Sequence, residues 1–229
     1  MTASVIRPAL WSGLSWVDRI RPGEALLQGR IYFMAKRALD LLLVLASAPL
    51  WLPVMAVTAL LVKLDDPHSP VIFSQRRAGR GGKPFAMRKF RTMVPDAEEL
   101  KKQLWHLNEL EWPDFKITND PRVTRPGRFL RKTSLDELPQ LLDVLAGHMS
   151  LVGPRPTGAT ADQYELWQTE RLDVSPGITG LWQLYGRATT MFEDRTRLDI
   201  AYVQRRCMLM DLQILIRTVP AVVAARGAH

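Results

Sequence analysis

The chain has 229 residues, enough for one main domain with short appendages and a sizeable core. Its formal net charge of +8 favours an anionic partner, such as nucleic acid, a lipid surface or a phosphorylated substrate. Cys207 is the single cysteine, which excludes an internal disulfide and a cysteine-rich zinc site and fits a reducing compartment.

Residues 1–35 are expected to form an interfacial arm, because Trp11 and Trp16 stand among arginines, as they do at membrane surfaces. No apolar core of a secretory signal precedes residue 38. An arm that docks onto the protein itself explains the same residues equally well, so both interpretations stay open.

Residues 36–63 contain the main apolar segment. From Leu41 to Val62 there are 22 residues without a charge, a length that can cross a hydrocarbon core. Pro49 and Pro53 fall in its middle, where each is expected to remove a helical hydrogen bond and bend the helix. Both ends prefer the cytoplasm by the positive-inside rule, because both are basic: Lys36, Arg37 and Lys63. We therefore predict a re-entrant membrane helix-hairpin that enters and leaves by one leaflet.

Residues 64–229 are expected to form a domain on the cytoplasmic face. A strand starting at Val71, a glycine-rich turn over residues 79–82 and a return strand from Pro84 predict a small β-hairpin. The return strand carries cations that form either a solvated face or a phosphate grip: Arg88, Lys89 and Arg91. Helices are predicted over residues 95–111, 159–172, 191–206 and 209–223, the last broken at Pro220 and suited to a core or interfacial position.

Residues 133–140 place two adjacent carboxylates, Asp136 and Glu137, at the start of a short helix. Spacing alone favours a capping role, since Ser134 and Glu137 match a capping box. A helix that starts at Asp136 accommodates Pro139 better, because the missing N–H then falls in the first turn. The surroundings favour phosphate-ester chemistry instead, which needs cations beside a carboxylate: Lys89, Arg131, Arg155 and Arg187.

Short motifs follow one another in a fixed order along the chain. They are Lys36-Arg37-x-x-Asp40, the apolar segment with Pro53, residues 89–93 (KFRTM), residues 134–140 (SLDELPQ), residues 149–156 (MSLVGPRP) and residues 176–180 (PGITG) with Gly186-Arg187. In this order and spacing, from about Lys36 to Arg217, the chain resembles the bacterial sugar transferase family, the monotopic polyprenyl-phosphate phosphoglycosyl transferases.

The resemblance implies an α+β, mainly helical fold in which a re-entrant membrane helix-hairpin joins a cytoplasmic catalytic domain with a small β-hairpin and interfacial helices. It implies transfer of a sugar-1-phosphate from a UDP-sugar to undecaprenyl phosphate, with release of UMP. The reaction would initiate assembly of a surface glycan (exopolysaccharide, capsule or O-antigen) at the bacterial inner membrane. The implied partners are a UDP-sugar, undecaprenyl phosphate and a phospholipid membrane, and a homodimer stays open.

The resemblance also implies roles for single residues. Asp136 corresponds to a nucleophile that attacks the β-phosphate of the donor, giving a phosphosugar on the aspartate and ping-pong kinetics. Glu137 corresponds to a partner that helps to hold Mg²⁺ or manages a proton, so Asp136 and Glu137 form the expected metal site. The expected phosphate-binding residues are Lys89, Arg91, Arg131, Arg155 and Arg187, and the expected membrane-anchor and kink residues are Lys36, Arg37, Asp40, Pro49 and Pro53.

Two departures from the family pattern stand out. Leu52 replaces the serine that often precedes the kinking proline, and Leu184-Tyr185 replaces smaller or polar residues before Gly186-Arg187. The 229 residues do not contain the extra multi-helix membrane domain of larger relatives, so we expect the chain to be similar to the small catalytic form.

The alternative function is a non-catalytic basic protein that binds anionic lipid, which leaves the paired carboxylates unexplained. No nucleic-acid partner is expected, because the basic residues are dispersed and no recognised module is present.

Overall fold

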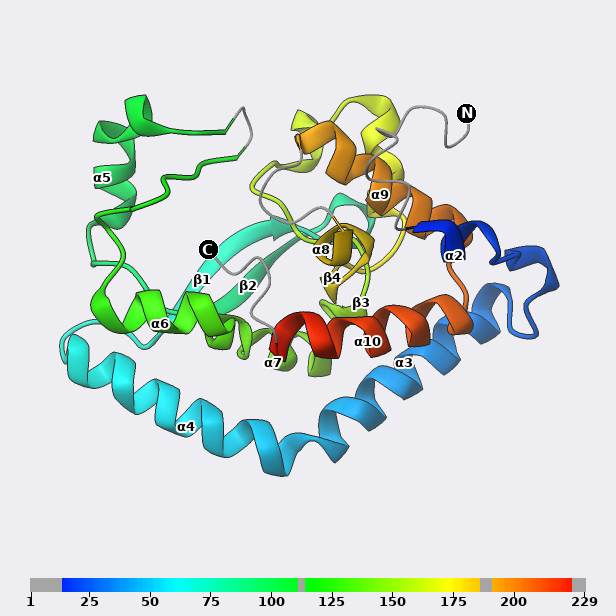
Figure 1. Ribbon diagram of the computed structural model, residues 1–229, viewed down its shortest axis with the longest axis horizontal. Helices are drawn as coiled ribbons and strands as arrows, with labels where there is room; N and C mark the ends of the chain where they lie inside the picture. The colour runs from blue at the N-terminus through cyan, green and yellow to red at the C-terminus, as the bar shows by residue number, and fades with distance from the viewer. Residues whose placement is uncertain (1–13, 111–113, 186–190, 224–229) are drawn as a thin grey trace.

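The computed structural model describes residues 14–110, 114–185 and 191–223 and shows a mixed helical fold with small strands (Figure 1). Two long helices, α3 (Gly29–Ala46) and α4 (Ala48–Asp65), run along one side of the molecule. The other elements lie together on the opposite side of this helix pair. The predicted class, mainly helical with a small β-hairpin, is confirmed at this level.

The bend in the apolar segment lies at Ser47, the residue between α3 and α4. The Ser47 hydroxyl donates to the carbonyl of Leu43 at 2.7 Å, which closes the last turn of α3. Pro49 lies in the first turn of α4, where its missing N–H costs no helical bond, and Pro53 lies inside α4. The prediction that Pro49 interrupts a continuous helix is therefore wrong, because Pro49 starts a new helix.

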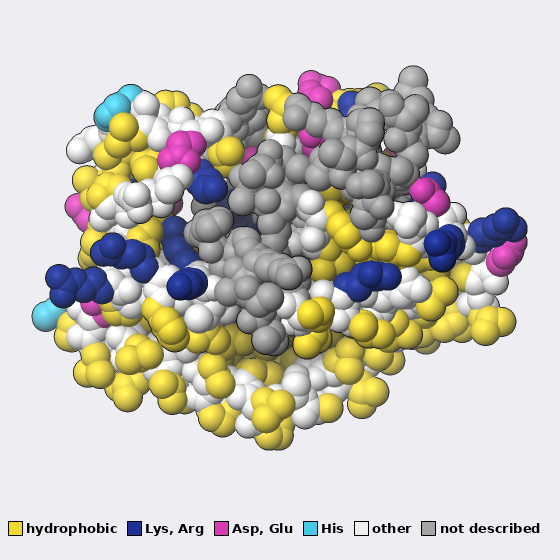
Figure 2. Space-filling model, in the orientation of Figure 1, with side chains coloured by type: hydrophobic (Ala, Val, Ile, Leu, Met, Phe, Trp, Pro, Cys, Tyr) yellow, Lys and Arg dark blue, Asp and Glu magenta, His cyan; other side chains and the backbone are white. Residues whose placement is uncertain are grey.

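The outer face of α3 and α4 is apolar and exposed, and Figure 2 shows it as the yellow base of the molecule. The large apolar side chains exposed on these two helices include Leu42, Leu45, Leu50, Val57, Leu60 and Leu64. Within the described chain, α4 is the one helix long and apolar enough to cross a membrane, judged by length and composition, and 17% of it is buried. This face is a large apolar surface without a protein partner in the described chain.

Two small sheets lie between the helices. The first is the predicted hairpin, in which β1 (Ile72–Ala78) and β2 (Pro84–Phe90) pair antiparallel and Phe73 lies opposite Lys89. The second, which the sequence did not indicate, pairs β3 (Ser150–Val152) in parallel with β4 (Gly177–Thr179). The two backbone segments approach closely here, since a Cβ on Gly177 would lie 2.0 Å from the backbone nitrogen of Gly153.

The remaining helices are short except near the C-terminus. They are α2 (Ser15–Asp18), α5 (Ala97–Gln103), α6 (Arg125–Thr133), α7 (Gln140–Leu145), α8 (Leu181–Tyr185), α9 (Phe192–Arg205) and α10 (Met208–Val223). Short 3-10 helices span Pro22–Glu24, Arg80–Gly82, Trp105–Leu107, Leu135–Glu137, Ala161–Gln163 and Leu166–Leu172. Residues 159–172 therefore form two 3-10 helices instead of the one helix predicted, and α10 continues through Pro220, where a break was predicted.

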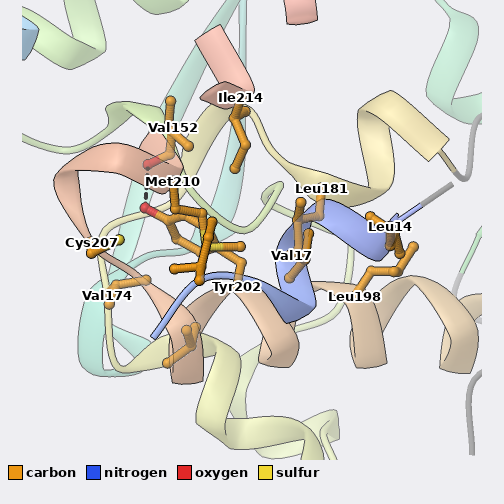
Figure 3. Close-up of a cluster of buried hydrophobic side chains, with 12 residues drawn as sticks. Leu14, Val17, Val152, Val174, Leu181, Leu198, Tyr202, Cys207, Met210 and Ile214 are labelled. Carbon is orange, nitrogen blue, oxygen red and sulfur yellow. Dashed lines mark hydrogen bonds between the residues drawn. The ribbon is translucent and has the colours of Figure 1, made fainter. Parts of the chain in front are cut away.

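A buried cluster joins the start of the described chain to its end (Figure 3). Leu14 and Val17 are fully buried and pack in the same cluster as Tyr202 of α9 and Met210 of α10. The phenol of Tyr202 also donates to the carbonyl of Val152 at 3.3 Å, linking α9 to β3. The described end of the N-terminal arm thus docks into the protein core, one of the two interpretations that the sequence left open.

Polar side chains on the inner face of α3 hold it to the rest of the protein. Asp211 of α10, 1% exposed, accepts hydrogen bonds from Tyr32 at 2.8 Å and Tyr202 at 2.7 Å and pairs with Lys36 at 3.2 Å. Lys36 was predicted as a membrane anchor, but its ammonium group points into the protein and pairs with a buried carboxylate.

The two other predicted anchor residues also point into the protein. Asp40 accepts from the hydroxyl of Ser150 at 2.7 Å. Arg37 donates to the last carbonyls of α7, those of Val144 at 2.5 Å and Leu145 at 2.9 Å. These contacts set the position of α3 relative to α7 and β3.

Replacing Lys36 by Met should lower the free energy of unfolding by about 3–5 kcal/mol, because Asp211 would remain buried with no cation to pair with. Replacing the exposed Lys63 of α4 by Met provides a control, because its amine only donates to the carbonyl of Ser69 at 3.2 Å. Denaturant unfolding of the purified protein in detergent measures both variants. Equal stability of the Lys36 variant and the wild type would contradict the assigned pair.

Candidate active site

The backbone around residue 134 places the two adjacent carboxylates. Ser134 has a left-handed backbone (φ 57°) and is the one non-glycine residue with positive φ in the described chain. It ends α6 and begins the 3-10 turn Leu135–Glu137, with α7 following from Gln140. Its side chain makes no capping hydrogen bond, and the carboxylate of Glu137 binds other groups. The capping-box interpretation is therefore wrong, and a strained residue stands directly before the acidic pair.

Glu137 is held between two cations. The Lys89 amine of β2 donates to Glu137 Oε1 at 3.0 Å, and Arg155 binds both carboxylate oxygens, with Nη1 to Oε2 at 2.9 Å. Burial raises the pKa of Glu137, but the charges of Arg155 and Lys89 outweigh it and hold the pKa well below its usual range. Glu137 therefore stays ionised, with both oxygens occupied by the two cations.

Asp136 differs from its neighbour although the two are adjacent. It is 8% exposed, and among the described residues no group makes a hydrogen bond or ion pair with its carboxylate. Burial raises the pKa of Asp136 above its ordinary value, against the opposing charge of Lys89. The two neighbouring carboxylates, with pKa values shifted in opposite directions, are therefore in different electrostatic environments: Glu137 is held by cations and Asp136 is open.

Arg131 lies beside this pair on α6. Its Nε donates to the hydroxyl of Thr92 at 3.0 Å, and its charge acts on Asp136. The contact requires α6 to lie against the chain at Thr92, and a Cβ on Gly127 would be 2.2 Å from the carbonyl oxygen of Thr92. Arg131 makes no ion pair within the described chain, and burial lowers its pKa. It is therefore a cation able to receive an anionic group.

The other predicted phosphate-binding residues do not join this cluster. Arg91 donates to the carbonyl of Pro70 at 2.9 Å and lines a separate cavity of about 310 Å³ at the end of α4. Arg187 lies outside the described residues. The structure thus brings together Asp136, Glu137, Lys89, Arg131 and Arg155.

Two buried acids that sequence reasoning missed support the cluster. Asp143 of α7, 0% exposed, accepts from the backbone N–H of Arg88 at 2.9 Å and from its guanidinium at 2.8 Å, which fixes β2 next to Lys89. Asp199 of α9 pairs with Arg171 at 2.5 Å, and burial raises the pKa of Asp199 to about 6. Arg171 also donates to the carbonyl of Arg155 at 2.6 Å and so positions that residue.

A sequence signal for one of these acids existed. Asp199 stands between Leu198 and Tyr202 in the predicted helix 191–206, and an acid among buried positions of a helix needs a partner. The partner, Arg171, could not be deduced, because it lies 28 residues away on another element.

The cluster fits a divalent cation only in part. Within the described chain no three His, Cys, Asp or Glu side chains lie close enough together to hold a metal ion. Glu137 has both oxygens engaged, whereas the Asp136 carboxylate is open. Mg²⁺ commonly takes one or two carboxylates, keeps several waters and completes its shell with substrate phosphates. Asp136 together with a diphosphate therefore suits this cation.

An open carboxylate beside Lys89, Arg131 and Arg155, on a protein with a large apolar face, is an arrangement suited to chemistry on a phosphate ester of a lipid. The family model described as bacterial sugar transferase matches residues 31–225, and the chain belongs to this family.

Individual relatives agree with this assignment. The chain is 40% identical to the exopolysaccharide production protein ExoY of Rhizobium meliloti over 86% of this chain and 88% of that protein. It is 38% identical to the UDP-glucose:undecaprenyl-phosphate glucose-1-phosphate transferase of Caulobacter vibrioides over 92% of this chain and 77% of that protein. It is 41% identical to the galactosyl transferase CpsE of Streptococcus agalactiae over 86% of this chain, which spans 44% of that longer protein.

Two substitutions should move the pKa of Asp136 in opposite directions. Lys89→Met removes a positive charge and should raise it, whereas Glu137→Gln removes a negative charge and should lower it. Titration of the Asp136 carboxyl by ¹³C NMR of aspartate-labelled protein measures both shifts, with the Asp136→Asn spectrum identifying the signal. Shifts of the same sign in both variants would contradict the assigned electrostatics.

Proposed function

We propose that the chain transfers a sugar-1-phosphate from a UDP-sugar to undecaprenyl phosphate, with release of UMP. The observation that carries the proposal is the open carboxylate of Asp136 beside a Glu137 that is held by Lys89 and Arg155. Family membership and the names of relatives support it. One relative is a UDP-glucose:undecaprenyl-phosphate glucose-1-phosphate transferase, and another is an undecaprenyl-phosphate galactose phosphotransferase from Salmonella typhimurium, 43% identical over 73% of this chain.

The proposed reaction has two steps. A carboxylate oxygen of Asp136 attacks the β-phosphorus of the donor, the bond from that phosphorus to the bridging oxygen breaks, and UMP leaves with the electron pair. A phosphate oxygen of undecaprenyl phosphate then attacks the same phosphorus, the bond to Asp136 breaks, and polyprenyl-diphospho-sugar forms. Each step exchanges one oxygen–phosphorus bond for another, so neither needs an oxidant or reductant.

The surrounding residues have distinct proposed roles in these steps. Lys89, Arg131 and Arg155 hold phosphate oxygens and balance the charge that collects on them. Glu137 keeps Lys89 and Arg155 in place between turnovers, when no phosphate is bound. Mg²⁺, held by Asp136 with the donor diphosphate, would reduce the repulsion between the anionic substrate and the carboxylates.

We also propose that α3 and α4 form a re-entrant pair in the cytoplasmic leaflet of the bacterial inner membrane. Both are exposed and apolar on their outer face, and Figure 2 shows a row of lysines and arginines above this apolar base, where lipid phosphates would lie. The start of α3 and the end of α4 both lie on the side of the catalytic elements (Figure 1). This arrangement places the active site next to the headgroup of a lipid acceptor. The product would start an exopolysaccharide or a related surface glycan, in line with the name of ExoY.

Asp136→Asn should lower UMP release from UDP-sugars by about 10⁴-fold or more while leaving the fold intact. The reason is that an amide cannot replace a carboxylate as nucleophile, although it has nearly the same size and shape. Asp173→Asn, at an exposed carboxylate, serves as the matched control. The assay combines a panel of UDP-sugars with undecaprenyl phosphate and Mg²⁺. An active, folded Asp136→Asn variant would favour the alternative function, a lipid-binding protein without catalysis.

Single cysteines at Glu24 and Glu99 test the membrane topology. Glu24 precedes α3 and has a side chain 71% exposed, Glu99 lies on the catalytic side, and the native Cys207 is buried. In the re-entrant arrangement both cysteines stay protected from an impermeant maleimide in intact cells and react after permeabilisation. Labelling of position 24 from outside, with position 99 protected, would show that the segment crosses the membrane.

A further inference from the structure

Arg77 is a partly buried cation that neither the sequence analysis nor the proposed mechanism uses. Its guanidinium donates to Gln75 Oε1 at 2.5 Å, and its Nε is buried without a hydrogen-bond partner in the described chain. Arg77 makes no ion pair with a carboxylate in the described chain. Asp114, one of the acids whose charge acts on Arg77, pairs with Arg195 instead. A buried guanidinium in this state is costly unless something anionic binds to it.

The register of the hairpin places Arg77 on the side of the active site. Phe73, Gln75 and Arg77 alternate along β1 and therefore share one face of the hairpin. Lys89 lies opposite Phe73 and so belongs to the same face. Since Lys89 binds Glu137, this face of the hairpin is directed at the acidic pair.

The end of β1 lies close to Arg155, because Ala78 and Gly79, which follow Arg77, line a small cavity together with Arg155. Burial lowers the pKa of Arg77, and among charged neighbours Arg155 has the largest effect, lowering it further. Arg155 also binds Glu137, the neighbour of the proposed nucleophile. Arg155 therefore lies near the acidic pair and near the end of β1 that carries Arg77.

We propose that Arg77 and Arg155 form an anion subsite for the nucleotide-side phosphate of a nucleoside diphosphate sugar. This inference rests on the proposed function and assigns the part of the donor that Arg77 recognises. The β-phosphate lies next to Asp136, and the α-phosphate, one bridging oxygen farther on, lies between the two arginines. With Arg77 added to Lys89, Arg131 and Arg155, four cations stand against two carboxylates, and the two negative charges of a UDP-sugar balance the difference.

UDP binding by the full-length protein in detergent, measured by isothermal titration calorimetry, tests the subsite. Arg77→Met should raise the Kd for UDP at least tenfold, in keeping with loss of a charge-assisted contact, and leave the weak binding of uridine unchanged. Arg77→Lys should recover part of the loss, because it restores the charge without the planar fork. Arg76→Met is the matched control, since Arg76 is exposed and points to the opposite face of β1. It should bind UDP as the wild type does.

The thermal midpoint separates a binding role from a structural one. Because Arg77 has no carboxylate partner, Arg77→Met should melt at or above the temperature of the wild type. A lower midpoint, an unchanged Kd for UDP, or an equal loss in Arg76→Met would each overturn the inference. If the wild type releases UMP from a UDP-sugar while Arg77→Met binds UDP normally, only the subsite is wrong. If UDP binding depends on Arg77 but no UDP-sugar yields UMP, the subsite stands and the proposed function fails.

Discussion

The contact on which the active site depends is the ion triad of Lys89, Glu137 and Arg155. It joins β2, the 3-10 turn at Leu135–Glu137 and the loop after β3, which are far apart in the sequence. Glu137 neutralises two cations that would repel each other, and it would itself be costly to bury without them, so the triad is stable only when complete. Because Lys89 and Arg155 bind Glu137, neither of them pairs with Asp136, whose carboxylate remains open. In the proposed mechanism, Glu137 therefore maintains the site and Asp136 reacts.

The helix α3 has two unlike faces, which in the proposed membrane arrangement would hold this site at a fixed height above the lipid surface. Its inner face binds the rest of the protein through Lys36 and Asp40, while its outer face is apolar. Arg37 extends this attachment to the end of α7, the helix that follows the acidic pair. Three polar contacts thus connect α3 to α10, β3 and α7. The last two adjoin, in the sequence, the loop with Arg155 and the turn with the acidic pair. In the proposed arrangement, the depth of α3 in the leaflet sets the distance between Asp136 and the lipid phosphate.

Local signals in the sequence were enough to predict the hairpin and the helices 191–206 and 209–223, because each depends on a short run of residues. The residues of the cluster were predicted instead from the motifs taken together and from the family resemblance. The features that were missed depend on distant contacts. The parallel pairing of β3 with β4 involves three residues in each strand, too few to show a periodicity. The break at Ser47 follows from packing between segments. The partners of Glu137, Lys89 and Arg155, also come from distant segments, so the local sequence pattern wrongly suggested a capping box. The inward direction of Lys36 could likewise not be predicted, because its partner Asp211 lies far away in the sequence.

Intact-mass spectrometry of the full-length protein with a UDP-sugar, Mg²⁺ and no lipid acceptor shows whether Asp136 becomes covalently modified. The wild type should gain the mass of the sugar phosphate less one water, and peptide mapping should place the adduct on Asp136. The adduct should disappear when undecaprenyl phosphate is added and should never form on Asp136→Asn. A protein that turns over with both substrates, yet gains no mass with the donor alone and shows ternary-complex kinetics, would contradict the claim that Asp136 is the nucleophile.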